Sequence, residues 1–168
     1  MLKKRFSTEE FEKNRIKIEI ETNKFLVDHI VRVYKLFDGD IVSAIVLGAI
    51  SFHTISNIAP KLNHDTNKIS KALANQNDSS IPPCNAYSIS ESTGIPRETV
   101  RRKIEKLVQA GFITKNTKSE VFFKEGTQFF FSHFSLETAN NVLNAADNLR
   151  EFIAPNSNQQ IKQYKESK

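Results

Sequence analysis

The sequence predicts a mainly helical protein that carries one small β-hairpin. Apolar residues recur at helical spacing in a long N-terminal segment and again near the C-terminus. Between them, residues 41–59 carry no formal charge, which favours a buried helix. A single strand–turn–strand pattern lies between residues 112 and 123. These features indicate a helical scaffold around one small sheet.

The N-terminal segment from Thr8 to about Phe37 is expected to form one long helix. Ser7 and Glu10 have the spacing of a capping box just before it. Residues 16–21, IKIEIE, alternate as a strand would, but their flanks are helical and no turn signal interrupts them. The apolar positions at three- and four-residue steps are Ile16, Ile20, Val27, Ile30, Val31, Tyr34 and Phe37.

A second helix is expected over residues 41–59, after a DGD turn in which Asp40 is the N-cap. The uncharged stretch is 19 residues long, enough to span a bilayer. Its second half is polar, and no aromatic belt or positive cluster flanks it tightly. We therefore expect a central helix buried on most sides, packed between other helices or at a dimer interface, rather than a membrane span. Pro60 is expected to end it.

The remaining scaffold is a connector and a C-terminal helix. Residues 64–83 are polar and turn-rich, with a short helix expected near residues 68–74. A helix is expected from about Ser135, which can cap it, to Ile153. The tail after Pro155 is polar and is expected to be disordered.

Positive charge is concentrated in one part of the chain. The net charge is +5, and residues 96–124 alone hold eight Lys and Arg against three Glu. The rest of the chain therefore sums to neutral. A localised basic excess favours an acidic partner, with nucleic acid first and anionic lipid second. A single Cys, Cys84, excludes an internal disulfide and fits a reducing cytoplasm, and no secretory signal is recognised at the N-terminus.

Two short helices separated by a tight turn precede the predicted hairpin. Asn85 can cap the first, and Gly94 accepts the positive φ that ends it. Pro96 suits the first turn of the second helix, and Gly111 ends that helix. On this helix Val100, Ile104, Leu107 and Val108 form the inner side. The outer side and its edges carry Glu98, Thr99, Arg101, Arg102, Lys103, Glu105 and Lys106. Arg97 lies nearer the inner side, but in the first turn, from which its side chain can still reach forward.

The hairpin follows at once, in FITKNTKSEVFFKE (112–125). Two apolar strand segments flank a polar loop that contains Lys115 and Lys118. Such a basic loop beside a basic helix is placed to reach phosphate or the minor groove of DNA.

Residues 85–124 resemble the winged helix-turn-helix of bacterial transcription regulators of the GntR, MarR and CRP/FNR types. The matching motifs are A-x-x-I-x-x-x-T-G-I (86–95), P-R-E-T-V-R-R-K-I-E-K-L (96–107) and Q-A-G-F-I-T (109–114). Pro96 departs from the Ser or Thr usual there. The resemblance implies DNA contacts by Arg97, Glu98, Thr99, Arg101 and Arg102, with phosphate for Thr99 and Lys103 and a base edge for Arg102.

The resulting expectation is a sequence-specific transcriptional regulator that binds double-stranded DNA as a homodimer in the cytoplasm, away from membranes. We expect a dimer because the scaffold has more apolar helix faces than one small domain needs to bury. Two alternatives stay open: a winged-helix adaptor that binds protein, which the acidic Glu98 and Glu105 favour, and a plasmid or phage replication initiator. No phosphate-binding or nucleophile motif and no metal-ligand spacing occurs, so neither enzyme activity nor a cofactor is expected. No effector is indicated.

The Phe-rich run 122–134 has two interpretations, a stacking platform for single-stranded nucleic acid or internal packing. We favour packing, because such apolar density is costly to expose. The predicted organisation is an N-terminal scaffold (1–60), a connector (61–84), a winged helix-turn-helix region (85–134), a C-terminal helix (135–154) and a tail (155–168).

Overall fold

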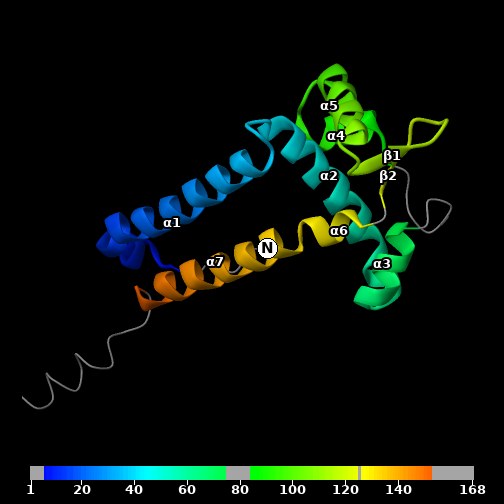
Figure 1. Ribbon diagram of the computed structural model, residues 1–168. Coiled ribbons are helices and arrows are strands. Elements are labelled where there is room, and N and C mark those ends of the chain that lie inside the picture. The colour runs from blue at the N-terminus through cyan, green and yellow to red at the C-terminus, as the bar shows by residue number, and fades with distance from the viewer. Residues whose placement is uncertain (1–5, 75–83, 125, 153–168) are drawn as a thin grey trace, which may run out of the picture. The chain divides into compact units, whose positions relative to one another are not determined.

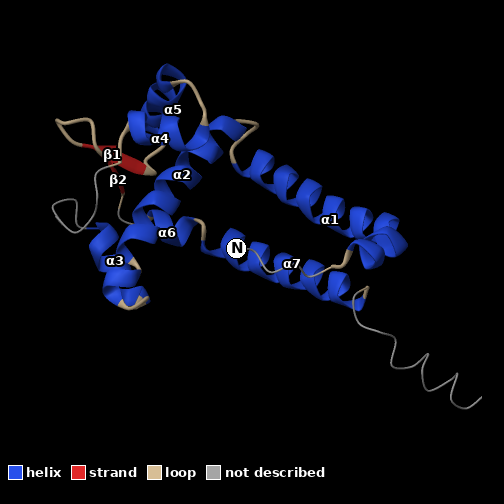
Figure 2. Cartoon of the chain, turned by 180° about the vertical axis from the view of Figure 1, so that it is seen from behind, coloured by secondary structure: helices blue, strands red, loops and turns tan. Residues whose placement is uncertain are grey.

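The computed structural model of the chain describes residues 6–74, 84–124 and 126–152. It is mainly helical with one two-stranded antiparallel hairpin, as the sequence predicts (Figures 1 and 2). The chain divides into two compact units, which are described separately. The helix-pair unit comprises residues 1–32 and 134–168, and the hairpin unit comprises residues 33–133. The predicted tail, 155–168, and residues 75–83 of the connector lie outside the described residues.

The helix-pair unit consists of α1 (Thr8–Leu36), whose last turn passes into the hairpin unit, and α7 (Ser132–Glu151). The expected capping box starts α1, since Ser7 N donates to Glu10 Oε2 at 2.8 Å and Glu10 N donates to Ser7 Oγ at 3.1 Å. The helical prediction for the alternating IKIEIE stretch is confirmed.

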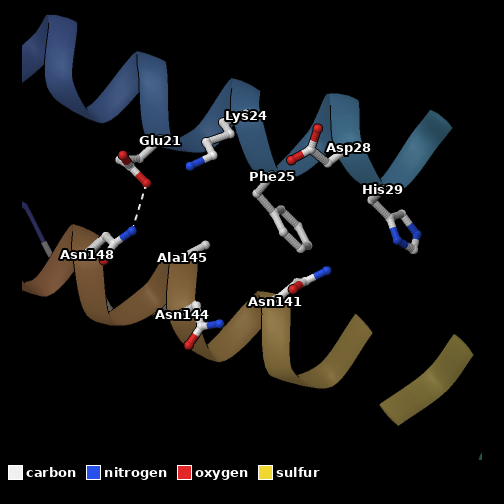
Figure 3. Close-up of a pocket in the computed structure, with 9 residues that line it drawn as sticks. All are labelled: Glu21, Lys24, Phe25, Asp28, His29, Asn141, Asn144, Ala145 and Asn148. Atoms are coloured by element: carbon white, nitrogen blue, oxygen red, sulfur yellow. Dashed lines mark hydrogen bonds between the residues drawn. The ribbon is translucent and has the colours of Figure 1, made fainter. Parts of the chain in front are cut away.

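The two helices of this unit run antiparallel and meet mostly through polar side chains. Asn148 Nδ2 donates to Glu21 Oε2 at 2.9 Å across the shallow pocket shown in Figure 3. Further along, Arg32 forms an ion pair with Glu137 at 2.9 Å. Among the described residues of the unit, only Ile18 is buried. The pair therefore has a very small apolar core of its own.

The predicted start of the C-terminal helix at Ser135 is wrong. The helix α7 begins three residues earlier, at Ser132, so Ser135 lies inside it and does not cap it. The earlier start brings Phe134 into the first turn, where its ring stacks under the Arg32 guanidinium at 4.7 Å. No Gly or Pro between residues 127 and 135 interrupts the helical conformation.

The hairpin unit is built on α2 (Ile41–Ile58), followed by a 3₁₀ turn η1 (Pro60–Leu62) and α3 (Thr66–Ala74). The expected Asp40 cap is present, with Ser43 N donating to Asp40 Oδ1 at 3.0 Å. Helix α3 confirms the short helix expected in the connector. The unit continues with α4 (Ala86–Thr93), α5 (Arg97–Gln109), β1 (Ile113–Lys115), β2 (Val121–Phe123) and α6 (Thr127–Phe130).

One core joins α2 to the later elements of the hairpin unit. Its buried members are Val46, Leu47 and Ile50 from α2, Ile89 from α4, Val100, Ile104 and Leu107 from α5, Ile113 and Val121 from the strands, and Cys84. The strands pair with Thr114 opposite Phe122, and Val121 N also donates to Cys84 O at 2.8 Å. The core therefore fixes α4, α5 and the hairpin on one side of α2.

Within the single chain, α2 is not buried on most sides, and its burial at a dimer interface stays a prediction. Its partners cover one side, and Ile45, Phe52 and Ile55 on the other are exposed. By length and composition, α2 is the one helix in the described chain that is apolar enough to cross a membrane. In the structure its inner side packs against α4 and α5.

Part of the Phe-rich run packs as predicted. Phe131 stacks on Phe37 with ring centroids 6.0 Å apart and meets Phe112 at 5.4 Å. Thr127 Oγ1 donates to Phe112 O at 2.8 Å and ties α6 to the end of α5. Phe130, by contrast, contacts Phe112 and Phe131 but remains 59% exposed.

Candidate nucleic-acid interface

The turn between α4 and α5 is defined by hydrogen bonds that the sequence predicts in part. Asn85 Oδ1 accepts from Tyr87 N at 2.9 Å and Ser88 N at 3.1 Å, and Ser88 Oγ accepts from Asn85 N, which completes a capping box. Gly94 ends α4 with φ of +72°, the left-handed conformation expected there. Ser90 Oγ donates to Ile95 O at 2.8 Å and closes the turn.

Helix α5 separates an apolar inner side from a charged outer side. Val100, Ile104 and Leu107 are buried against α2 and α4, as predicted. Pro96 precedes the first turn with φ of −53° and ψ of 133°, and no side chain caps that turn. The first backbone N–H groups of α5 are therefore left without a side-chain cap, and a helix N-terminus favours an anion.

Arg97 and Arg102 are exposed on α5, and neither forms an ion pair within the described part of the chain. The Arg97 guanidinium lies 6.0 Å from the centre of the Tyr87 ring of α4. Thr99 is half-buried beside them. Sequence reasoning missed Tyr87, whose aromatic character beside a helix cap gives no signal of this contact.

Arg101 is exposed but is held by carboxylates on both sides along α5. Its Nη2 lies 2.7 Å from Glu98 Oε1 and its Nη1 lies 2.8 Å from Glu105 Oε1. The hydrogen bond to Glu98 and the two negative charges raise the pKa of Arg101, and the same bond lowers the pKa of Glu98. Arg101 therefore presents less net charge to a partner than its exposure suggests.

Lys103 and Lys106 both bind Asp40, which lies in the turn before α2. Lys103 Nζ is 2.8 Å from Asp40 Oδ1, and Lys106 Nζ is 2.7 Å from Asp40 Oδ2. Burial alone would raise the pKa of the Asp40 carboxyl, but hydrogen bonds from both lysines and from Ser43 outweigh it and hold that pKa well below its usual range. The Lys103 side chain is only 17% exposed, so it is less accessible than the sequence suggested.

The hairpin presents Lys115, the last residue of β1, and Lys118, in the loop, to solvent. Asn116 organises the loop, because its Oδ1 accepts from Lys118 N and Glu120 N, both at 3.0 Å. Its Nδ2 also donates to Glu120 Oε2 at 2.6 Å. The loop is thus fixed by one side chain, while Lys115 and Lys118 of the hairpin are exposed to solvent.

A groove runs between α4, the start of α5 and the hairpin loop. It brings together four of the predicted residues, Arg97, Arg101, Lys115 and Lys118, with Glu105 and Tyr87 in its walls. Arg102, Lys103 and Lys106 do not line it. Two elements that are separate in sequence therefore converge on one basic surface, with Arg102 exposed elsewhere on α5.

Comparison of the chain with known protein families, curated proteins and solved structures finds no match. The residues of the basic groove and of α5 therefore carry the functional proposal.

Proposed function

We propose that this chain is a sequence-specific DNA-binding transcriptional regulator that acts as a homodimer in the cytoplasm. In this proposal α4 and α5 form a helix-turn-helix and the β1–β2 hairpin is its wing. The observation that carries it is the groove in which Arg97 of α5 meets Lys115 and Lys118 of the hairpin. The proposal includes no cofactor and no enzyme activity.

The groove suits a phosphate backbone. Arg97 stands in the first turn of α5, where the helix dipole adds to its charge. Lys115 and Lys118 extend the positive surface along the loop, and phosphate contacts of this kind position a protein on DNA without reading sequence. Glu105 in the wall of the groove is paired with Arg101, which limits its repulsion of phosphate.

Arg102 is the residue best suited to read a base. It is exposed on α5, and within the described residues no carboxylate is ion-paired with it. An arginine in the major groove of DNA can donate two hydrogen bonds to O6 and N7 of one guanine. Such a pair contributes about 1–3 kcal/mol of discrimination against the other bases. Arg101 is less suited, because Glu98 and Glu105 already occupy its donors.

Fluorescence anisotropy with DNA fragments from around the protein's own gene tests the proposal. Wild type should bind one fragment tightly, with a log–log salt slope of about −0.9 per phosphate neutralised. Arg102→Ala should abolish the preference for that fragment, whereas Lys118→Ala should weaken every fragment alike and make the slope shallower by about 0.9. Arg150→Ala is the matched control, since it removes an exposed arginine from α7. It should change neither the preference for one fragment nor the salt slope.

A protein-binding adaptor is the second candidate, and the Glu98–Arg101–Glu105 ion pairs favour it because they place acidic groups on the outer side of α5. The same DNA titrations distinguish the adaptor from the DNA-binding regulator. Absence of binding above the non-specific level at low salt contradicts DNA recognition and favours the adaptor.

A further inference from the structure

Helix α1 carries an exposed apolar stripe that its own unit leaves uncovered. The stripe, called here the α1 seam, consists of Ile16, Ile20, Asn23, Val27 and Ile30. Its four apolar side chains are between 56% and 72% exposed. Isoleucine and valine are seldom gathered on a soluble helix without a partner surface. The seam therefore indicates a contact that one copy of the helix-pair unit does not make.

The side of α1 that packs on α7 lies away from the seam. Ile18 is buried there, Phe25 and His29 face the pocket shared with α7, and Asn14 Nδ2 donates to Phe152 O at 3.3 Å. At 100° per residue these positions fall nearly opposite the seam. The packing of α7 therefore does not cover the seam, and α1 has two separate packing faces.

The seam has the spacing of a coiled coil. Its members follow one another at steps of four, three, four and three residues, which is the a/d repeat of a heptad. A stripe confined to a and d positions is the narrow seam that a second helix covers. In this repeat Ile20 and Val27 occupy a positions and Asn23 occupies a d position as the single polar member. A buried amide needs a hydrogen-bonding partner, which an in-register pair supplies by placing Asn23 opposite Asn23 of the other helix.

The charges beside the seam select the partner and its direction. Lys17 and Lys24 lie on one side of it and Glu12 and Glu19 on the other. In a parallel, in-register pair, residue i of one helix meets residue i+5 of the other across the seam. Glu12 then meets Lys17, and Glu19 meets Lys24. An antiparallel pair would instead bring Glu near Glu and Lys near Lys.

The next such pair along the helix is apolar. Leu26 and Val31 are five residues apart, lie on the same two sides of the seam, and are 46% and 42% exposed. In a parallel pair each Leu26 meets the Val31 of the other helix, which widens the apolar contact toward the C-terminal end of α1. The charged pairs and the apolar pair thus both favour the parallel, in-register arrangement of two α1 helices.

We infer that α1 forms a parallel, in-register, two-stranded coiled coil with α1 of a second copy of this chain. The inference rests on the proposed function only in naming the interface of its homodimer, and it does not require DNA binding. Because α1 leads directly into the hairpin unit, a parallel pair starts both hairpin units from the same end of the coiled coil.

Sedimentation equilibrium of the full chain tests the interface. One chain has a mass of 19.1 kDa, so wild type should sediment at twice that value and Val27→Glu at the single value. Circular dichroism should show that Val27→Glu keeps its helices, since Val27 is 56% exposed and belongs to neither buried cluster of the described residues. The controls are Leu143→Glu on α7, 58% exposed against 56% for Val27, and Phe52→Glu on α2, 77% exposed. Both are exposed apolar positions outside the seam and should leave the dimer intact.

Charge exchange tests the pairing. Glu19→Lys should weaken the dimer because it sets a second positive charge against Lys24 of the other copy, and adding Lys24→Glu should restore it. Glu19 also accepts from Arg15 Nε at 2.9 Å within its own chain, so Arg15→Ala measures the loss of that contact separately. Failure of the double exchange to restore association contradicts the parallel pairing.

Disulfide trapping tests the direction independently. In the parallel pair Val27→Cys faces its own copy, so mild oxidation should give a covalent dimer in high yield. Wild type is the control, because its one cysteine, Cys84, is 1% exposed and should not cross-link. A covalent dimer that forms only when Ile16→Cys and Val27→Cys chains are mixed would show an antiparallel pair, in which a d position faces an a position.

Two results overturn the inference: a wild type that stays monomeric, or a Val27→Glu chain that stays dimeric while Leu143→Glu or Phe52→Glu dissociates. Neither depends on DNA. A dimer that binds no DNA contradicts the proposed DNA recognition and leaves the coiled coil standing. A monomer that binds DNA overturns the coiled coil and the proposed homodimer and leaves DNA recognition standing.

Discussion

At the scale of single residues, Asp40 connects two parts of the hairpin unit. It caps α2 through Ser43 and binds Lys103 and Lys106 of α5, 63 and 66 residues away. Its side chain is 12% exposed, so these contacts are little weakened by solvent. One carboxylate thus fixes the outer side of α5 relative to the start of α2.

Asp40→Asn should destabilise the fold in a pH-dependent way. Asn retains the helix cap but loses the charge, so the unfolding free energy near neutral pH should fall by about 1–3 kcal/mol. The folded-state pKa of Asp40 lies below its ordinary value of 3.8. Its stabilisation is therefore complete above that value and is lost as the pH falls below it. Urea denaturation over this range measures the difference.

Glu98→Gln is the matched control for Asp40→Asn. Glu98 also forms an ion pair with a basic residue of α5, Arg101. Because Glu98 is exposed, loss of its charge should change the free energy of unfolding little. If Asp40→Asn were equally destabilising at neutral pH and at about pH 3, the ion pairs would not be the source of the effect.

At the scale of elements, the turn between α4 and α5 depends on one glycine. Gly94 has φ of +72°, and a Cβ added to it would meet no atom within 4 Å. Gly94→Ala should therefore cost only backbone strain, about 1–2 kcal/mol. Gly48→Ala, inside α2 and equally free of contacts, should instead stabilise the protein by about 0.5–1 kcal/mol. Thermal denaturation should show a lower melting temperature for Gly94→Ala and a higher one for Gly48→Ala. Equal shifts in melting temperature would contradict the argument from backbone strain.

The helices were the most predictable elements, because their signals are local. The Ser7–Glu10 capping box, the caps at Asp40 and Asn85, Gly94 and the periodicity of α1 all lie within a few residues of what they determine. The start of α7 was mispredicted because Ser135 has the residue type of a cap, while Phe134 packs on Arg32, 102 residues away in the chain. Likewise, nothing local relates Asp40 to Lys103, so their ion pair, and with it the reduced access of Lys103, required the structure.

At the scale of the whole molecule, apolar burial is very uneven. The two buried clusters lie entirely within residues 33–133, whereas the described part of the helix-pair unit buries only Ile18. A helix pair with so little core is marginal in isolation. Its stability should therefore depend on association through the α1 seam.

Hydrogen exchange measured by mass spectrometry should show this difference. Amides of α7 should exchange faster than those of α5, and protection in α7 should rise with protein concentration as the dimer forms. Protection in α5 should not change with concentration, which makes it the internal reference. Equal and concentration-independent protection in both helices would contradict a helix-pair unit stabilised by association.

The core of the hairpin unit also contains segments that are synthesised at different times, because α2 is made before the helices that cover it. Helix α2 is completed at Ile58, but Leu107, which helps cover it, is 49 residues further along the chain. At about 5–20 residues per second, a growing chain therefore carries an uncovered α2 for roughly 2–10 seconds. During that interval the ribosome presents an uncharged helix of membrane-spanning length. Each newly made copy must pass through this interval before α5 covers the inner side of α2.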